Sequence, residues 1–125
     1  QFRAAHAALR HPTWIEPAQV AWLDGNIAIA NGAYDDASKN VLAWQLDGAA
    51  LGRSAPSIYV AYNRGAADVV LQLPAPPANL AWYRVADPGA WMGPQANASA
   101  PGDEYKMNQR RYDLTARSLA LFIAR

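Results

Sequence analysis

The chain begins with a helical pattern of apolar positions and continues with a series of short alternating ones. One helical face near the start carries Phe2, Ala5, His6 and Leu9, and Pro12 ends the pattern. No residue ahead of Phe2 provides a capping side chain, and this stretch is shorter than the ~12 to 15 residues that an isolated helix needs in water. We therefore expect it to be the end of a helix that continues upstream.

Beyond residue 13 the periodicity changes to that of short strands. Apolar runs recur between turn residues, a pattern typical of antiparallel sheets. The runs are QVAWLDGN, NVLAWQLDG, SIYVAYNRG, ADVVLQLPAPP, LAWYRVADPG, a segment from Tyr112 to Leu114, and SLALFIA. Because both faces of several runs are apolar, we expect an all-β fold, an antiparallel two-sheet β-sandwich of the Greek-key type whose outer face is partly covered. The short helical segment precedes this sandwich.

The segments between the runs predict how the strands connect. Asn63, Arg64 and Gly65 separate two runs by a short turn, and we expect a tight hairpin there because Asn and Gly tolerate positive φ. The segment PAPPANL, residues 74–80, cannot pair inside a sheet, since proline lacks the amide donor. We expect it to cross between the two sheets. Longer loops are expected over residues 26–38 and 88–107.

The composition narrows the possible functions. The chain has 125 residues, 52% of them hydrophobic and 17% charged, which suits a single domain with one core. Lys and Arg number 11 against 10 for Asp and Glu, so no excess of positive charge favours nucleic acid as a partner. No apolar run reaches the length of a membrane span, so we expect no membrane partner. Without cysteine there is neither a disulfide nor a thiolate metal site.

The residues that carry most enzyme chemistry form no recognisable site. His6 and His11 lack acidic neighbours at ligand spacing, so we expect no metal and no cofactor. The sequence lacks G-x-S-x-G, H-E-x-x-H and any glycine-rich phosphate loop. Adjacent carboxylates occur at residues 35–36 and 103–104, in polar segments where solvated surface charge is the simpler interpretation. No catalytic residue is predicted.

The aromatic residues provide the remaining candidates for a binding site. Five Trp and six Tyr are many for this length, and flat rings are suited to stacking on sugar rings. Four of them lie in alternating runs, where we expect them to fill the core between the sheets: Trp22, Trp44, Tyr59 and Trp82. Trp91 and Tyr34 lie in irregular segments, so they are the candidates for carbohydrate contact.

Five segments, taken in order, resemble a known family. FRAAHAALR is similar to the last barrel helix of isoamylase-type glycogen and starch debranching enzymes, within the α-amylase superfamily. NVLAWQLDG, SIYVAYN, LQLPAPPANLAWYRVAD and the Arg117-Ser118-Leu119 of ARSLALFIA are similar to the carboxy-terminal β-domain that follows this helix in bacterial isoamylases. Ala7 departs from the pattern, because the family often has proline there.

The resemblance implies a parent enzyme that hydrolyses α-1,6 branch linkages in glycogen or amylopectin. The catalytic carboxylates of that family lie upstream, at the carboxyl ends of barrel strands, so this chain is expected to catalyse nothing by itself. On this interpretation, residues 1–12 are the last helix of the catalytic barrel and residues 13–125 are the C-terminal β-sandwich domain. We expect the sandwich to pack on the barrel and stabilise it, with Phe2 and Leu9 at the interface.

Two other functions remain open from the sequence. The chain could be an independent module that binds α-glucan, with Trp91 and Tyr34 as stacking platforms. It could also be an immunoglobulin-like interaction domain, which shares the sandwich fold, although the typical Cys and Trp arrangement is absent. Slowed migration of the isolated chain in a glycogen-containing native gel, abolished by Trp91→Ala, would favour the binding module.

Overall fold

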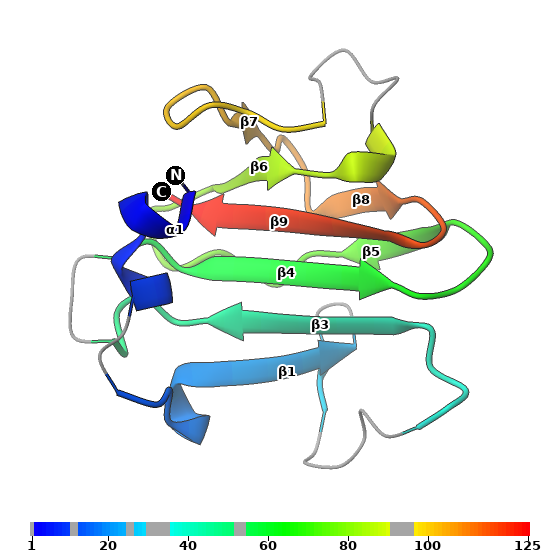
Figure 1. Ribbon diagram of the computed structural model, residues 1–125, viewed down its shortest axis with the longest axis horizontal. Helices are drawn as coiled ribbons and strands as arrows, with labels where there is room; N and C mark the ends of the chain where they lie inside the picture. The colour runs from blue at the N-terminus through cyan, green and yellow to red at the C-terminus, as the bar shows by residue number, and fades with distance from the viewer. Residues whose placement is uncertain (1, 11–12, 25–26, 30–35, 52–54, 91–96) are drawn as a thin grey trace.

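The computed structural model describes residues 2–10, 13–24, 27–29, 36–51, 55–90 and 97–125. Within these ranges the chain forms a seven-stranded antiparallel sheet with a two-stranded antiparallel sheet behind it (Figure 1). The larger sheet has the strand order β2-β1-β3-β4-β9-β6-β7. Its strands are β1 (Val20–Asp24), β2 (Ile27–Ala28), β3 (Val41–Leu46), β4 (Ile58–Asn63), β6 (Trp82–Ala86), β7 (Tyr105–Lys106) and β9 (Ser118–Ala124). The smaller sheet pairs β5 (Val69–Gln72) with β8 (Arg111–Leu114). The expected all-β sandwich is confirmed.

The helical segments within the described ranges are all short. They are α1 (Phe2–Ala5) and the 3₁₀ turns η1 (Ala7–Arg10), η2 (Pro17–Gln19) and η4 (Pro88–Ala90). The prediction of one continuous helix at the start is wrong in detail. The segment is interrupted at His6, with an α-helical turn before this residue and a 3₁₀ turn after it. The His6 ring donates from Nδ1 to the Phe2 carbonyl, 2.8 Å away, which is the acceptor of an ordinary i to i−4 helix bond. No helix in the described ranges has both the length and the apolar character needed to cross a membrane.

The main core lies between the two sheets. Its centre is the Tyr59 ring, fully buried, whose centroid is 5.9 Å from those of Trp82 and Phe122. Burial raises the pKa of the Tyr59 hydroxyl above its usual value. The cluster is completed by Leu23, Ala43, Ala61, Ala120 and Ala124 from the larger sheet, and by Leu71, Leu73 and Leu114 from the β5 and β8 strands or next to them. Tyr59 and Trp82 are therefore core residues, as the sequence predicted.

A second apolar cluster lies on the outer face of the larger sheet. It contains Leu46, Ile58, Val60, Val85 and Ile123 from the strands, together with Ala8 and Leu51. The prediction that Trp22 and Trp44 fill the core between the sheets is wrong. Trp44 packs against this outer cluster, and Trp22 is its direct partner across the β1–β3 pairing, on the same face. Both rings are only half-buried.

The connections differ from expectation at two points. The segments 26–38 and 88–107, expected to be loops, contain the short strands β2 and β7, which extend the larger sheet by pairing with β1 and β6. The predicted hairpin at Asn63–Gly65 does not form, because β4 pairs with β3 on one edge and with β9 on the other, while β5 pairs with β8. The segment instead crosses from the larger sheet to the smaller one, and the buried Asn63 side chain donates to the carbonyls of Ala67 and Thr115. Residues 74–80 do cross back between the sheets, as predicted, since they join β5 to β6.

Candidate functional site

The N-terminal segment packs on the outer face of the larger sheet. In Figure 1, α1 and η1 lie in front of the sheet at the end where β4 and β6 begin and β3 and β9 finish. Ala8 is buried in the outer cluster, and Phe2 and Leu9 pack against the same cluster while remaining partly exposed. The two residues predicted to face a preceding domain therefore contact the sandwich itself.

His6 stabilises the packing of the first turn on this face. Its ring stacks on Phe2, with the centroids 3.9 Å apart and an interplanar angle of 29°. The ring is buried, and its Nδ1 donates to the Phe2 carbonyl. This histidine has a structural role here, and His11 lies outside the described residues. No three His, Asp or Glu side chains within the described ranges are grouped as a metal site.

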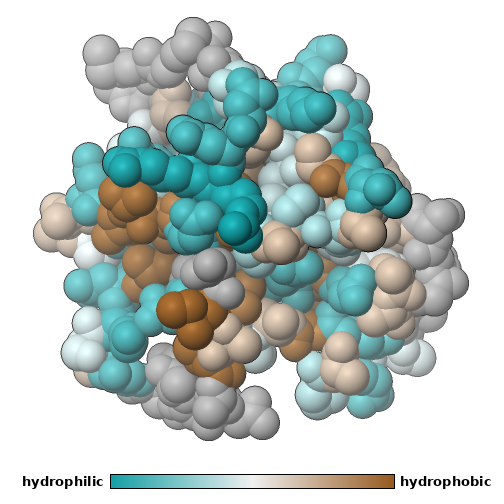
Figure 2. Space-filling model, turned by 180° about the vertical axis from the view of Figure 1, so that it is seen from behind, coloured by the Kyte–Doolittle hydropathy of each residue, from teal (hydrophilic) through white to brown (hydrophobic). Residues whose placement is uncertain are grey.

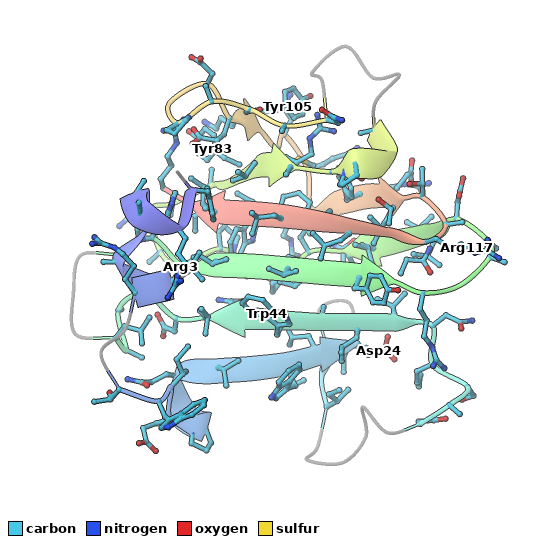
Figure 3. All side chains as sticks on the ribbon, viewed as in Figure 1. Arg3, Asp24, Trp44, Tyr83, Tyr105 and Arg117 are labelled. Carbon is cyan, nitrogen blue, oxygen red and sulfur yellow. The ribbon has the colours of Figure 1, made fainter. Side chains whose placement is uncertain are left out.

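The outer face continues beyond the N-terminal segment as a central row of apolar residues. The strand register aligns them across four strands: Trp22, Trp44, Val60 and Leu121. Figure 3 shows Trp44 on the front of β3, between the helical segment and the end of β1 at Asp24. The next row aligns Leu42, Tyr62 and Leu119, of which Tyr62 is 45% exposed and Leu119 38%. On the opposite side of the molecule, hydrophobic residues form separate patches between hydrophilic ones (Figure 2).

Tyr34 and Trp91, the residues predicted to contact carbohydrate, lie outside the described residues. The role proposed for them from the sequence therefore stays a prediction.

A buried carboxylate on the inner side joins three segments of the chain. Asp87, 1% exposed, accepts hydrogen bonds from the Ser118 hydroxyl at 2.9 Å, the Gly89 amide at 2.8 Å and the Tyr112 hydroxyl at 2.5 Å. Arg84 donates to the same Tyr112 hydroxyl at 3.2 Å. Burial and the hydrogen bond to Asp87 raise the pKa of Tyr112 to about 12. No role for Asp87 was predicted from the sequence, although Asp-Pro-Gly is a turn signal in which the carboxylate bonds the amide two residues on.

The hydrogen bonds of this network connect parts of the fold and do not have the geometry of a hydrolytic site. Ser118 donates directly to the carboxylate, whereas a hydrolytic triad places an imidazole between the two groups. His6, the histidine that the structure describes, lies on the other face of the sheet. The network also joins two of the segments that carry the family resemblance, because the Asp that ends YRVAD accepts a bond from the Ser of the Arg-Ser-Leu segment.

The carboxylates at residues 103–104 are not both the solvated surface charges that the sequence predicted. Glu104 was expected at the surface but is buried, and it forms an ion pair with Arg125 in which the atoms Oε2 and Nη2 are 2.9 Å apart. The same carboxylate accepts the Gly102 amide at 3.0 Å. The Arg125 guanidinium also lies over the Tyr83 ring, 4.5 Å from its centroid. The local sequence around Glu104 indicates only a polar loop. Its ion-pair partner, Arg125, directly follows β9 and is distant in sequence, so the burial of Glu104 could not be predicted.

Comparisons with known proteins agree with this architecture. Residues 19–123 match the family described as "Isoamylase, C-terminal". The isoamylase of Pseudomonas amyloderamosa is 40% identical over 104 residues, which cover 82% of this chain and 13% of that protein. The isoamylase of a Flavobacterium species is 39% identical over 136 residues, covering 99% of this chain and 17% of that protein.

The matched region is thus a small part of each relative, while it takes in most of this chain. It includes β1 at its start and nearly all of β9 at its end, so both sheets of the sandwich fall inside it. The chain belongs to the family of isoamylase C-terminal domains.

Proposed function

We propose that this chain is the non-catalytic C-terminal domain of an isoamylase-type debranching enzyme, a glycoside hydrolase that cleaves α-1,6-glucosidic branch linkages, and that it packs on the catalytic barrel and stabilises it. Family membership supports the parentage. The network around Asp87, which lacks the arrangement of a hydrolytic site, supports a structural rather than a catalytic role.

The observation that carries this proposal is the packing of the N-terminal segment. Phe2 and Leu9 contact the outer cluster. His6 and Ala8, which lie between these two residues in the chain, are buried and hold the segment on the sheet. Any chain that precedes Phe2 therefore starts from the outer face of the larger sheet. With residues 1–12 as the last barrel helix, the barrel lies next to this face, and the connection between the domains is short and held by packing.

The rest of the outer face suits such a contact. The central row, Trp22, Trp44, Val60 and Leu121, extends the apolar surface away from the N-terminal segment, and Leu119 beside it is 38% exposed. Within the row Val60 is buried, while Trp22, Trp44 and Leu121 are partly exposed. Contiguous apolar surface that remains accessible marks interaction sites in soluble domains. A preceding domain seated on α1 and η1 covers this row without further rearrangement.

The proposal is tested by comparing two matched variants in two contexts. Leu119→Lys places a charge on the outer face, while Leu80→Lys places one in the β5–β6 connection, where the leucine is 40% exposed. In the isolated chain both changes are at exposed positions, so each should change the free energy of unfolding by no more than ~0.5 kcal/mol. In the full-length parent, Leu119→Lys should lower the melting temperature of the catalytic domain by several degrees, because a charge is buried at the interface.

The Leu80→Lys protein is the control for charge alone. Equal melting temperatures for the two variants in the full-length parent would refute packing through the outer face. Release of sugar from branched glucan by the isolated wild-type chain would refute the non-catalytic role.

A further inference from the structure

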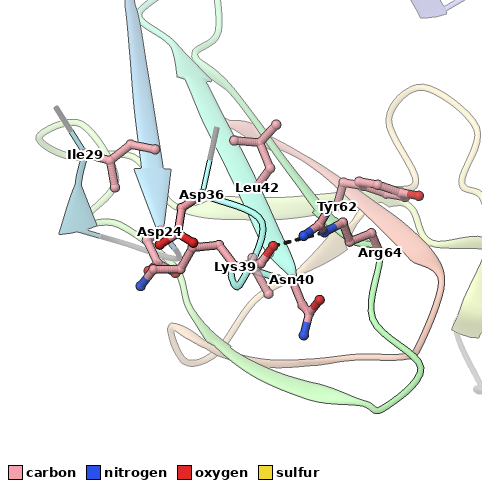
Figure 4. A pocket seen from close by; sticks show the side chains of 9 residues that line it. Asp24, Ile29, Asp36, Lys39, Asn40, Leu42, Tyr62 and Arg64 are labelled. Carbon is pink, nitrogen blue, oxygen red and sulfur yellow. Dashed lines mark hydrogen bonds and ion pairs between the residues drawn. The ribbon is translucent and has the colours of Figure 1, made fainter. Parts of the chain in front are cut away.

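A hollow of about 270 Å³ lies at the end of the larger sheet farthest from the N-terminal segment. It opens between the ends of β1, β3 and β4 and the turn at residues 36–39, as Figure 4 shows. Its size is close to the ~300 Å³ at the small end of ligand pockets. The side chains that define it are Asp24, Lys39, Asn40, Leu42, Tyr62 and Arg64.

The walls of the hollow are held by hydrogen bonds between segments distant in sequence. The Arg64 Nε donates to the Lys39 carbonyl at 3.0 Å, its guanidinium also donates to the Ala37 carbonyl, and its amide donates to the Asn40 carbonyl at 2.9 Å. Within the turn, the Asp36 carboxylate accepts from the Ser38 amide and hydroxyl. The site is therefore preformed, which lowers the ordering cost of binding a ligand.

The charges that line the hollow compensate one another. Lys39 pairs with Asp24 at 2.8 Å, and this bond raises the pKa of the lysine. Hydrogen bonds from Ser38 lower the pKa of Asp36. Arg64 is the second basic side chain of the lining. Two cations and two carboxylates leave no net charge, and a site of this kind has no preference for an ionic ligand. It presents several donors and acceptors to a neutral, polar one.

One side of the hollow is apolar and carries a flat ring. Leu42 and Tyr62 are direct partners across the β3–β4 pairing, so they share the outer face, and 45% of the Tyr62 surface is exposed. An exposed ring beside compensated polar groups matches a ligand with an apolar face and a polar rim. Pyranose rings have this form, because their C–H groups stack on an aromatic face while their hydroxyls reach donors and acceptors around it.

We propose that this hollow is a saccharide-binding site in which a sugar ring stacks on Tyr62 and its hydroxyls bond to Asn40, Lys39 and Asp24. Tyr62 is the direct partner of Leu119, which the proposed barrel contact covers, so the site is tested in the isolated chain, where both side chains are exposed. Four residue steps along β3 separate Leu42, the partner of Tyr62, from Leu46 at the end that the N-terminal segment covers, about 13 Å of extended chain.

The test is a titration of the ¹⁵N-labelled chain with maltotriose, followed by amide chemical shifts. We expect saturable shifts at the amides of Lys39, Asn40, Tyr62 and Arg64. Tyr62→Phe should keep this binding, since the ring is retained, while Tyr62→Ala should weaken it at least tenfold. Tyr105→Ala, which removes a ring that is 36% exposed on β7, should bind like the wild type.

Sodium phosphate, titrated against matched sodium chloride, should leave the same amides unshifted, because the site is neutral. The proposal is overturned by shifts that do not saturate, by shifts that map elsewhere, or by equal affinity of wild type and Tyr62→Ala. A phosphate response at these amides also overturns it, since it identifies an anion site. The amide spectrum of each variant shows whether it is folded, and these outcomes leave the barrel contact untouched.

Discussion

Replacing Tyr112 with phenylalanine isolates the contribution of the buried network. The change removes the hydroxyl that donates to Asp87 at 2.5 Å and accepts from Arg84 at 3.2 Å. The ring stays, with its edge-to-face contact to Phe122 at 5.1 Å between centroids. A hydrogen bond to a charged group contributes roughly 1.5–3 kcal/mol, so we expect the free energy of unfolding to fall by about 2 kcal/mol at pH 8.

Urea unfolding measures this change directly. With a slope of about 2 kcal/mol per molar urea, the midpoint should move down by about 1 M. Tyr105→Phe is the control, because that tyrosine is exposed on β7 and its ring is retained; its midpoint should match the wild type. Coinciding midpoints for the two variants would show that the Asp87–Tyr112 bond adds nothing to stability and that the network argument is wrong.

The same variant has a distinct pH dependence. The Tyr112 pKa of about 12 lies above its ordinary value of 10.0, so the folded state favours the protonated hydroxyl. This stabilisation is fully present below pH 10 and is lost as the pH rises toward 12. Tyr59 is raised in the same direction in both proteins, so it cancels in the comparison. The wild type should therefore lose its stability advantage over Tyr112→Phe between pH 10 and 12, and a constant difference across that range would contradict the assignment.

Three further changes test the packing. Leu9→Ala should lower the free energy of unfolding by about 1–2 kcal/mol in urea, less than for a fully buried leucine because Leu9 is half-exposed; no change would mean that the N-terminal segment does not dock. Gly89→Ala should cost ~1–3 kcal/mol, since its Cβ would lie 1.8 Å from the Thr115 Oγ1, and a wild-type melting temperature would contradict this. Lys39→Met should leave the urea midpoint unchanged, because its ion pair with Asp24 is exposed to solvent; a clear drop would refute this.

The sequence was sufficient to locate the longer strands, but it did not predict the two-residue strands β2 and β7, and it did not decide which face of each strand is buried. Alternation shows that Leu42, Trp44 and Leu46 share a face, and they do. It does not tell which of two apolar faces meets the second sheet, and for this reason the prediction that Trp44 lies in the core is wrong. The small residues opposite, such as Ala43, face the core because the rings of Tyr59 and Phe122 already fill that space.

The sequence also did not predict correctly which strands pair with one another. Asn63 and Gly65 have the local chemistry of a hairpin, yet both edges of β4 are already occupied, one by the preceding strand β3 and the other by β9, which is distant in sequence. The hollow beside Tyr62 could not be predicted for the same reason, since Asp24, Lys39 and Arg64 meet only after three strands have paired. Proline content, by contrast, predicted the crossover at residues 74–80, because a missing amide donor is a local property.

The position of β9 has a consequence for folding during synthesis. This strand lies between β4 and β6, yet the ribosome makes both of those strands before it makes residues 118–124. Until then the larger sheet can form only in two parts, β2-β1-β3-β4 and β6-β7. Each part has an edge strand whose backbone amides and carbonyls lack the partners that β9 will provide. Closure depends on contacts distant in sequence, which form slowly, so the emerging domain is exposed to aggregation until its last strand inserts.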